Sequence, residues 1–312
     1  MPPKVIPPRL HVLIASEAPY AVVLARIGKA YCKQLAWDLE TDTFALGHIH
    51  PGRIYELRSD LSADGRLMIT LSLHQGTIIS EVPSFNPIRF EESHGTWFGG
   101  GVWVSSNRYW RHTWQDPANK YVFEIFEISE QQIADAKFGG FERNLSRKGP
   151  YDILTSPEID SSELRWNLFV EPSGRFDQPP LREGNWAVYS ERLCRDGWRR
   201  VTEFREGGYG GRHVHERDLP FGAILRKLSH EGRDPKRGKG YDWQHHVLVN
   251  ADKQEFTFED WEWAEYDVPR DRILYAEKGK IFAVKLTHEG LGEPVELFDS
   301  TQYGRDPVVA PY

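Results

Sequence analysis

Short hydrophobic or alternating runs, separated by polar turns, dominate the chain. Many are four to eight residues long and rich in Val, Ile, Tyr, Phe and Trp, a pattern typical of half-buried β-strands. The pattern therefore predicts a mostly-β protein with these strands: Leu10–Ala15, Tyr20–Ile27, Lys33–Asp38, Arg53–Leu57, Leu67–Leu73, Gly101–Ser105, Tyr109–Trp114, Tyr121–Ile128, Arg165–Val170, Trp186–Leu193, Trp198–Phe204, Gly222–Leu228, His245–Val249, Glu255–Phe258, Arg272–Ala276, Lys280–Leu286 and Val295–Phe298.

Three short turns that end in Gly join pairs of these runs. They are Ala63-Asp64-Gly65, Arg195-Asp196-Gly197 and Glu277-Lys278-Gly279. Gly supplies the positive φ that tight hairpins need, so the turns predict three hairpins and a meander topology.

One short helix is predicted over residues 130–138. Ser129 and Gln132 have the spacing of a capping box, and Ile128 and Ile133 have that of a hydrophobic staple. Gly139-Gly140 ends the helix. The polar stretch from Gly139 to Ser162 has few strand features, so we expect an insertion around 129–162.

An internal similarity links residues 59–72 to residues 264–277. Each segment has an acidic residue, a short turn, an Arg and then an apolar strand. The turn Ser62-Ala63-Asp64-Gly65-Arg66 resembles the turn of the bacterial WD40-like β-propeller repeats found in TolB-type proteins, with Ala where those repeats usually have Pro. The resemblance implies a blade architecture and brings no catalytic residue with it.

The expected architecture is one small all-β propeller domain over residues 1–312. Units of roughly 45–55 residues give about five blades, with six as the alternative count. Closure would pair a strand near Leu10–Ala15 with strands near the C-terminus. A pair of β-sandwiches is the alternative, because sandwiches also consist of alternating strands and hairpins.

Composition narrows the class of protein. The aromatic share of 13% favours β structure, and the formal net charge of −7 argues against general nucleic-acid binding. No stretch has the roughly 20 apolar residues of a membrane-spanning helix. The N-terminal apolar run is too short for a signal peptide, so we expect a cytoplasmic protein. Cys32 and Cys194 are expected to be reduced, buried thiols.

Two pairs of histidines have the i, i+2 spacing that places side chains on one face of a strand. They are His48 with His50 and His213 with His215. Together they suggest a metal site as an alternative hypothesis. The simpler interpretation is that both pairs are solvated histidines at turn edges.

The stretch 258–267 is rich in carboxylates and aromatics. Asp260, Glu262 and Glu265 are candidate acids of a carbohydrate-active hydrolase at the propeller channel. Alternation gives a simpler explanation, in which Trp261 and Trp263 face the core while Asp260 and Glu262 face water.

The glycine-rich segments match no nucleotide-binding motif, so no cofactor is expected. Gly99-Gly100-Gly101 is expected to let the backbone approach an aromatic cluster that is either core or a binding surface: Trp97, Trp103 and Trp110. The basic run Arg226–Lys239 is expected to be a solvated loop.

The leading functional hypothesis is a non-catalytic scaffold that binds another protein through one face. It rests on the lack of a catalytic motif in the sequence and on the tendency of loops and insertions to carry binding. The predicted insertion offers charge and an aromatic anchor for such a partner: Arg143, Arg147, Lys148 and Tyr151.

Overall fold

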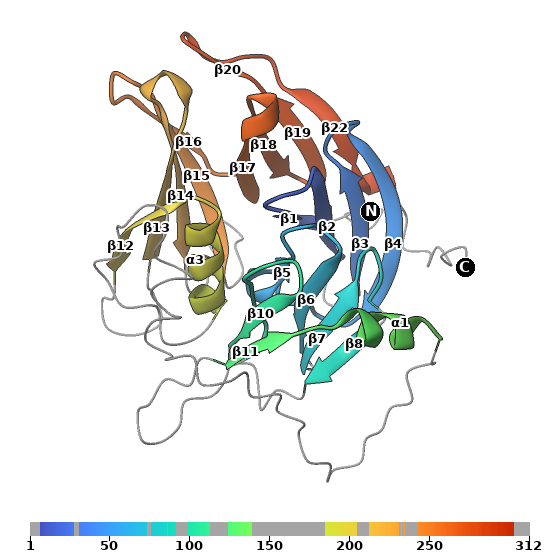
Figure 1. Cartoon of the computed structure of the whole chain (residues 1–312). Helices are drawn as coiled ribbons and strands as arrows, with labels where there is room; N and C mark the ends of the chain where they lie inside the picture. Colours follow the sequence, from blue (N-terminus) through green and yellow to red (C-terminus); the bar gives the residue numbers. More distant parts are fainter. Residues whose placement is uncertain are drawn as a thin grey trace. The chain divides into compact units, whose positions relative to one another are not determined.

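Consecutive strands pair in antiparallel fashion throughout the computed structural model (Figure 1). The structure describes residues 7–27, 31–73, 76–85, 87–91, 99–112, 124–138, 185–204, 212–230, 232, 234 and 242–302. Because each strand lies beside the next one in sequence, tight turns at the ends of the sheets make most of the connections. The meander topology predicted from the turn residues is confirmed.

Five antiparallel sheets form the blades of a five-bladed β-propeller, and the described residues also contain two short α-helices. The β1–β4 sheet consists of β1 (Arg9–Ile14), β2 (Tyr20–Ile27), β3 (Tyr31–Asp38) and β4 (Thr43–Pro51). The β5–β8 sheet consists of β5 (Asp60–Leu61), β6 (Leu67–Ser72), β7 (Gly76–Glu81) and β8 (Pro87–Glu91). The β9–β11 sheet consists of β9 (Gly101–Trp103), β10 (Arg108–Arg111) and β11 (Glu124–Glu127).

The other two blades come from the C-terminal part of the chain. The β12–β16 sheet consists of β12 (Arg199–Phe204), β13 (Arg212–Asp218), β14 (Ile224–His230), β15 (Trp243–Val249) and β16 (Glu255–Phe258). The β17–β22 sheet consists of β17 (Trp263–Asp267), β18 (Arg272–Glu277), β19 (Lys280–Val284) and β22 (Val295–Asp299). A small hairpin of β20 (Leu286–Thr287) and β21 (Gly290–Leu291) lies between β19 and β22 in sequence. The prediction of a propeller with about five blades is confirmed.

The predicted pairing of the N-terminal strand with C-terminal strands is wrong. β1 lies beside β2 at the edge of its own four-stranded sheet, and β22 pairs with β19 through contacts such as Lys280 with Asp299. Each of these two sheets therefore takes its strands from one continuous part of the chain.

The chain divides into two compact units. One contains residues 1–12, 23–51 and 193–312, and the other contains residues 13–22 and 52–192. We refer to them as unit 1 and unit 2. The division passes through the β1–β2 hairpin.

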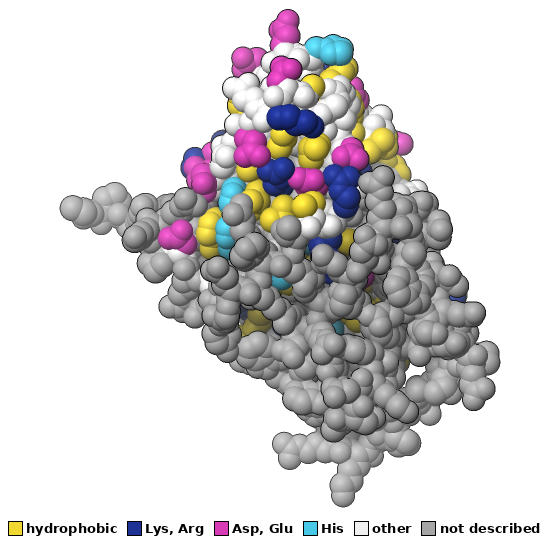
Figure 2. All heavy atoms as spheres, turned by 90° about the vertical axis from the view of Figure 1, so that its left-hand side faces the viewer, with side chains coloured by type: hydrophobic (Ala, Val, Ile, Leu, Met, Phe, Trp, Pro, Cys, Tyr) yellow, Lys and Arg dark blue, Asp and Glu magenta, His cyan; other side chains and the backbone are white. Residues whose placement is uncertain are grey.

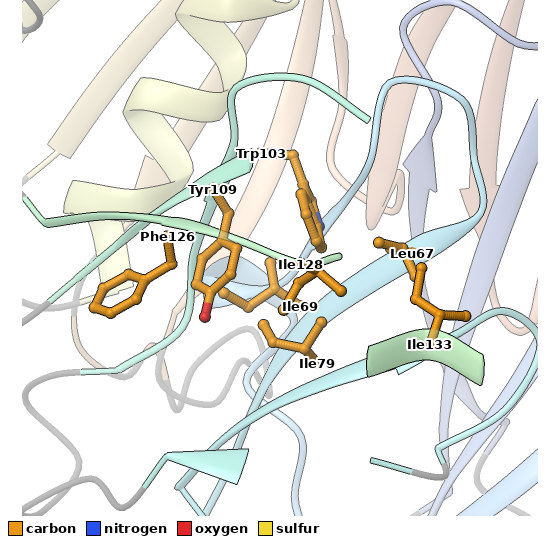
Figure 3. Packing of buried hydrophobic residues seen from close by; sticks show 8 residues of the cluster. All are labelled: Leu67, Ile69, Ile79, Trp103, Tyr109, Phe126, Ile128 and Ile133. Carbon is orange, nitrogen blue, oxygen red and sulfur yellow. The ribbon is translucent and has the colours of Figure 1, made fainter. Parts of the chain in front are cut away.

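One hydrophobic core cluster of unit 2 joins five strands of two sheets to a helix (Figure 3). Trp103 and Tyr109 pack edge to face with ring centroids 5.2 Å apart, and Tyr109 stacks on Phe126 at 5.5 Å. The whole cluster comprises Leu67, Ile69, Ile79, Trp103, Tyr109, Phe126, Ile128 and Ile133.

Helix α1 (Glu130–Phe138) has the predicted bounds and the predicted capping box. The Ser129 backbone N–H donates to Oε1 of Gln132 at 2.8 Å, and the Gln132 N–H donates to Oγ of Ser129 at 3.2 Å. Ile128 and Ile133 both belong to the core cluster, as a hydrophobic staple requires.

The prediction of a strand over Trp186–Leu193 is wrong, because this segment lies in helix α3 (Asn185–Arg195). Trp186, Tyr189 and Leu193 are buried and recur at the three- and four-residue spacing of one helix face. The Arg195-Asp196-Gly197 turn therefore ends a helix instead of closing a hairpin. The N–H of Gly197 (φ +90°) donates to the carbonyl of Cys194 and the N–H of Trp198 to that of Leu193.

The other two Gly turns are hairpin turns as predicted. Lys278 and Gly279 both have positive φ, and Glu277 pairs with Lys280 across the turn between β18 and β19. At the turn between β5 and β6, the Ser62 hydroxyl donates to Asp64 at 2.7 Å and accepts from the N–H of Leu67 at 2.8 Å. Side chains and Gly65 together thus fix this turn.

Candidate binding surface

Five turn segments lie together at one end of the sheets of unit 1. They are residues 38–43, 218–223, 250–254, 267–272 and 285–290, and we refer to them as the turn surface. They connect β3 to β4, β13 to β14, β15 to β16, and β17 to β18, and the fifth lies at the tip of the β20–β21 hairpin.

Contacts between neighbouring turns join these segments into one surface. Nη1 of Arg272 lies 2.6 Å from Oδ2 of Asp42, which connects two sheets. The register of Ile273 with Val284 places residues 272 and 285 side by side. The rings of Phe221 and His288 lie 4.0 Å apart between centroids, which connects the β20–β21 hairpin to the β13–β14 turn.

Phe221 is the most unusual residue of the turn surface. Its backbone is left-handed (φ 61°, ψ 21°), and its side chain is 42% exposed. Pro220 before it has a restricted φ, and Gly222 after it also has positive φ. A bulky residue in this conformation costs about 1–3 kcal/mol and is enriched at functional sites. The fold therefore presents an aromatic ring to solvent at an energetic cost.

The turn surface is acidic. It carries eight carboxylates and four cationic side chains, so its formal charge is −4. Two of the cations are occupied internally: Arg270 pairs with Asp267, and Arg272 pairs with Asp267 and Asp42. At the upper end of Figure 2, acidic side chains lie beside a histidine and hydrophobic side chains. The surface thus combines negative charge with apolar and aromatic groups.

Hydrogen bonds fix two of the acidic turns. The N–H of Glu40 donates to Asp38, and this bond is the main cause that lowers the pKa of the Asp38 carboxyl below its usual value. Burial, together with a hydrogen bond from the Tyr266 hydroxyl to Asp271, raises the pKa of Tyr266 to about 12. Asp38 is therefore charged and Tyr266 neutral at pH 7.

The two histidine pairs are not the solvated turn-edge residues that the simpler interpretation expected. His50 lies buried on β4, and His213 and His215 lie buried on β13, in a different sheet. His48 is half-buried. No group of three or more His, Cys, Asp or Glu suited to a metal occurs within the described residues. The hypothesis of a shared metal site therefore has no supporting cluster in this part of the chain.

His215 belongs to a buried polar row that the sequence did not indicate. Lys227 on β14 lies directly opposite His215 on β13 and His246 on β15, and it is 1% exposed. Its Nζ lies 4.2 Å from the ring centroid of Trp198 and 3.8 Å from Oε2 of Glu265. Because Lys227 is inaccessible to a ligand, we assign this row to packing.

The three candidate catalytic carboxylates each have another partner. Asp260 is exposed and lies 2.9 Å from Nζ of Lys278, and Glu262 accepts from the N–H of Leu10 at 3.1 Å. Glu265 accepts from the indole N–H of Trp198 at 2.9 Å and also pairs with Arg217. The hydrolase hypothesis stays a prediction without a supporting geometry.

The aromatics of the same stretch form a core stack, as alternation predicted. Trp261 and Trp263 are buried. Trp261 stacks on Phe258 at 3.9 Å and on Tyr275 at 4.2 Å, and Tyr275 stacks on Phe282 at 5.1 Å.

The predicted aromatic binding residues lie partly outside the described part of the chain. Trp103 and Trp110 are buried in unit 2, so of the two alternatives the structure favours core for these rings. Trp97 and the four insertion residues Arg143, Arg147, Lys148 and Tyr151 lie outside the described residues. Cys32 is buried and Cys194 half-buried, and neither forms a disulfide.

Comparison with known proteins finds likeness at the level of structure. No family model matches the chain, and no curated protein matches it. The Cps50 (Swd1) β-propeller domain of Myceliophteria thermophila is similar in structure, with 8% identity and a TM-score of 0.33 over 93% of this chain and 87% of that chain. No helix within the described residues has the length and apolar character needed to cross a membrane.

Proposed function

We propose that this propeller is a non-catalytic protein-interaction scaffold that binds a partner protein through the turn surface. The observation that carries the proposal is Phe221, an exposed aromatic residue held in a left-handed conformation, with its ring packed at a tilt against that of His288. Aromatic side chains are enriched among the residues that contribute most to protein–protein binding.

The arrangement of rigid and variable parts supports the same proposal. Turns between strands tolerate sequence change and are positioned by the sheets behind them, which is why binding residues are concentrated on loops. Val268, on the turn between β17 and β18, adds a second exposed apolar side chain, at 58%. The turn surface thus offers an aromatic and an apolar group on fixed supports.

Site-specific photo-cross-linking tests the proposal. Phe221 is replaced by the photoreactive benzoylphenylalanine in the full chain, and the source cells are irradiated. The matched control is the same replacement at Tyr31, which is 46% exposed at the start of β3, the end of that strand away from the 38–43 turn.

The proposal predicts one dominant adduct of defined mass at position 221 and none of that mass at position 31. No adduct at position 221, or the same adducts at both positions, would overturn it.

A further inference from the structure

The charge of the chain is concentrated on the turn surface. Its 29 residues carry a formal charge of −4, whereas all 312 residues carry −7. More than half of the net negative charge therefore lies on less than a tenth of the chain. A charged patch of this kind attracts a partner of opposite charge and accelerates its association.

Three carboxylates of the turn surface are available to a partner. Glu40, Asp252 and Glu289 are exposed, and none has an ion pair within the described part of the chain. Arg270 and Arg272, by contrast, are held by Asp267 and Asp42. Lys253 and Lys285 are the exposed cations that remain, and they leave the excess negative.

The exposed ring of Phe221 lies beside the turns that carry two of these carboxylates, Asp252 and Glu289. A Cβ added at Gly222 would lie 3.8 Å from Cβ of Ala251, so the turn that contains Asp252 lies beside Gly222. Glu289 directly follows His288, whose ring packs against that of Phe221. The face of an aromatic ring attracts a guanidinium or ammonium group, and carboxylates beside it pair with the same cation. An apolar side chain next to that cation would contact the edge of the ring.

From these observations we infer that the turn surface binds a cationic segment of its partner, in which Arg or Lys side chains alternate with apolar ones. This inference rests on the proposed function and specifies the chemistry of the partner. Nucleic acid does not fit, because phosphates would meet the carboxylates.

Fluorescence anisotropy with defined peptides tests the inference. The probe is a fluorescein-labelled peptide of twelve residues that contains four arginines and two leucines among glycines and serines. The comparison peptide has glutamate in place of each arginine. Both are titrated with the full chain at low and at high salt.

The test variant is the triple change Glu40→Gln, Asp252→Asn and Glu289→Gln. The matched control removes the same charge from the other end of the sheets by Glu259→Gln, Asp260→Asn and Glu277→Gln. An exposed ion pair changes a binding constant by about a few-fold. We therefore expect the test triple to weaken peptide binding about tenfold and the control triple to weaken it less than about twofold.

The inference predicts that the arginine peptide binds and weakens with salt, while the glutamate peptide does not bind. Equal losses in the two triple variants would show attraction by the overall charge and would overturn it, as would equal binding of the two peptides. If cross-linking at position 221 succeeds while the peptides show no charge preference, only the chemistry assigned to the partner fails. If both experiments fail, the proposed function fails with it.

Discussion

Lys227 shows how this fold accommodates a buried charge. Its ammonium group has the carboxylate of Glu265 at 3.8 Å and the face of Trp198 at 4.2 Å, while the imidazoles of His215 and His246 lie on the flanking strands. Burial is the main cause that lowers the pKa of both histidines well below 6.5, and the nearby Lys227 lowers it further. A neutral imidazole beside a buried cation avoids the repulsion that an imidazolium would add.

Because His215 and His246 are neutral in the folded protein, we expect the free energy of unfolding to fall as the pH is lowered. Below about pH 6.5 the unfolded chain protonates both histidines, whereas the folded chain does not, so the unfolded state binds more protons. Each histidine then removes roughly 1.4 kcal/mol from the free energy of unfolding per pH unit. Besides Lys227, the nearby His213 and Arg200 also lower the pKa of His215. His245 has the same effect on the pKa of His246.

The variant His215→Gln isolates one of the two contributions. Urea unfolding at pH 7.5, 6.0 and 5.0 measures the free energy of unfolding of the variant and of the wild type. Between pH 6.0 and 5.0, the free energy of the variant should fall less steeply than that of the wild type, by roughly 1.4 kcal/mol per pH unit. An acid slope equal to that of the wild type would mean that His215 is already protonated in the folded protein.

Residue type and spacing could not have identified this row. His213-Val214-His215 alternates as any half-buried strand does, and the strand direction alone does not say which face is covered. The face is decided by Lys227 on β14 and by the neighbouring sheet that supplies Glu265. These partners are far away in sequence, so the histidines were expected to be solvated.

At the scale of elements, local patterns were informative where the local sequence decides the structure. The capping box of Ser129 and Gln132 fixes the start of α1, and the glycine turns fix two hairpins. Helix α3 was missed because Trp186, Val188 and Tyr189 fit both alternation and a helical face over so short a run. The absence of Gly and Pro within 185–195 and the spacing to Leu193 favoured the helix.

Gly101 at the start of β9 offers a sharp test of close packing in unit 2. A Cβ at this position would lie 2.2 Å from the carbonyl oxygen of Trp110 and 2.9 Å from Cδ1 of Ile69. Backbone must shift to admit it, so Gly101→Ala should destabilise the protein by about 3 kcal/mol.

Gly197→Ala is the matched control for this substitution. Gly197 has φ +90°, but an added Cβ would meet nothing within 4 Å, so its cost is conformational and about 1–2 kcal/mol. Urea midpoints of the two variants measure the difference. Equal losses would show that the approach of Trp110 to Gly101 is not tight.

At the scale of the whole molecule, strand lengths and turn spacing were sufficient for the fold class and the number of blades. They were not sufficient to predict the pairing partner of β1, because the sequence of a strand such as Leu10–Ala15 does not indicate which sheet the strand joins. The turn surface was missed for a related reason. Phe221, Asp42 and His288 lie far apart in sequence and come together only when three sheets place their turns at one end.

The predicted binding role of residues 139–162 remains a separate prediction, since this segment lies outside the described residues.

Hydrogen–deuterium exchange of the full chain, with and without the protein recovered by cross-linking at Phe221, tests the central claim most directly. Binding at the turn surface predicts slower amide exchange in segments 218–223, 250–254 and 285–290, with no change at the Glu277–Lys280 turn at the other end of β18. Unchanged exchange in all three segments, or slower exchange confined to the opposite turn, would contradict the claim.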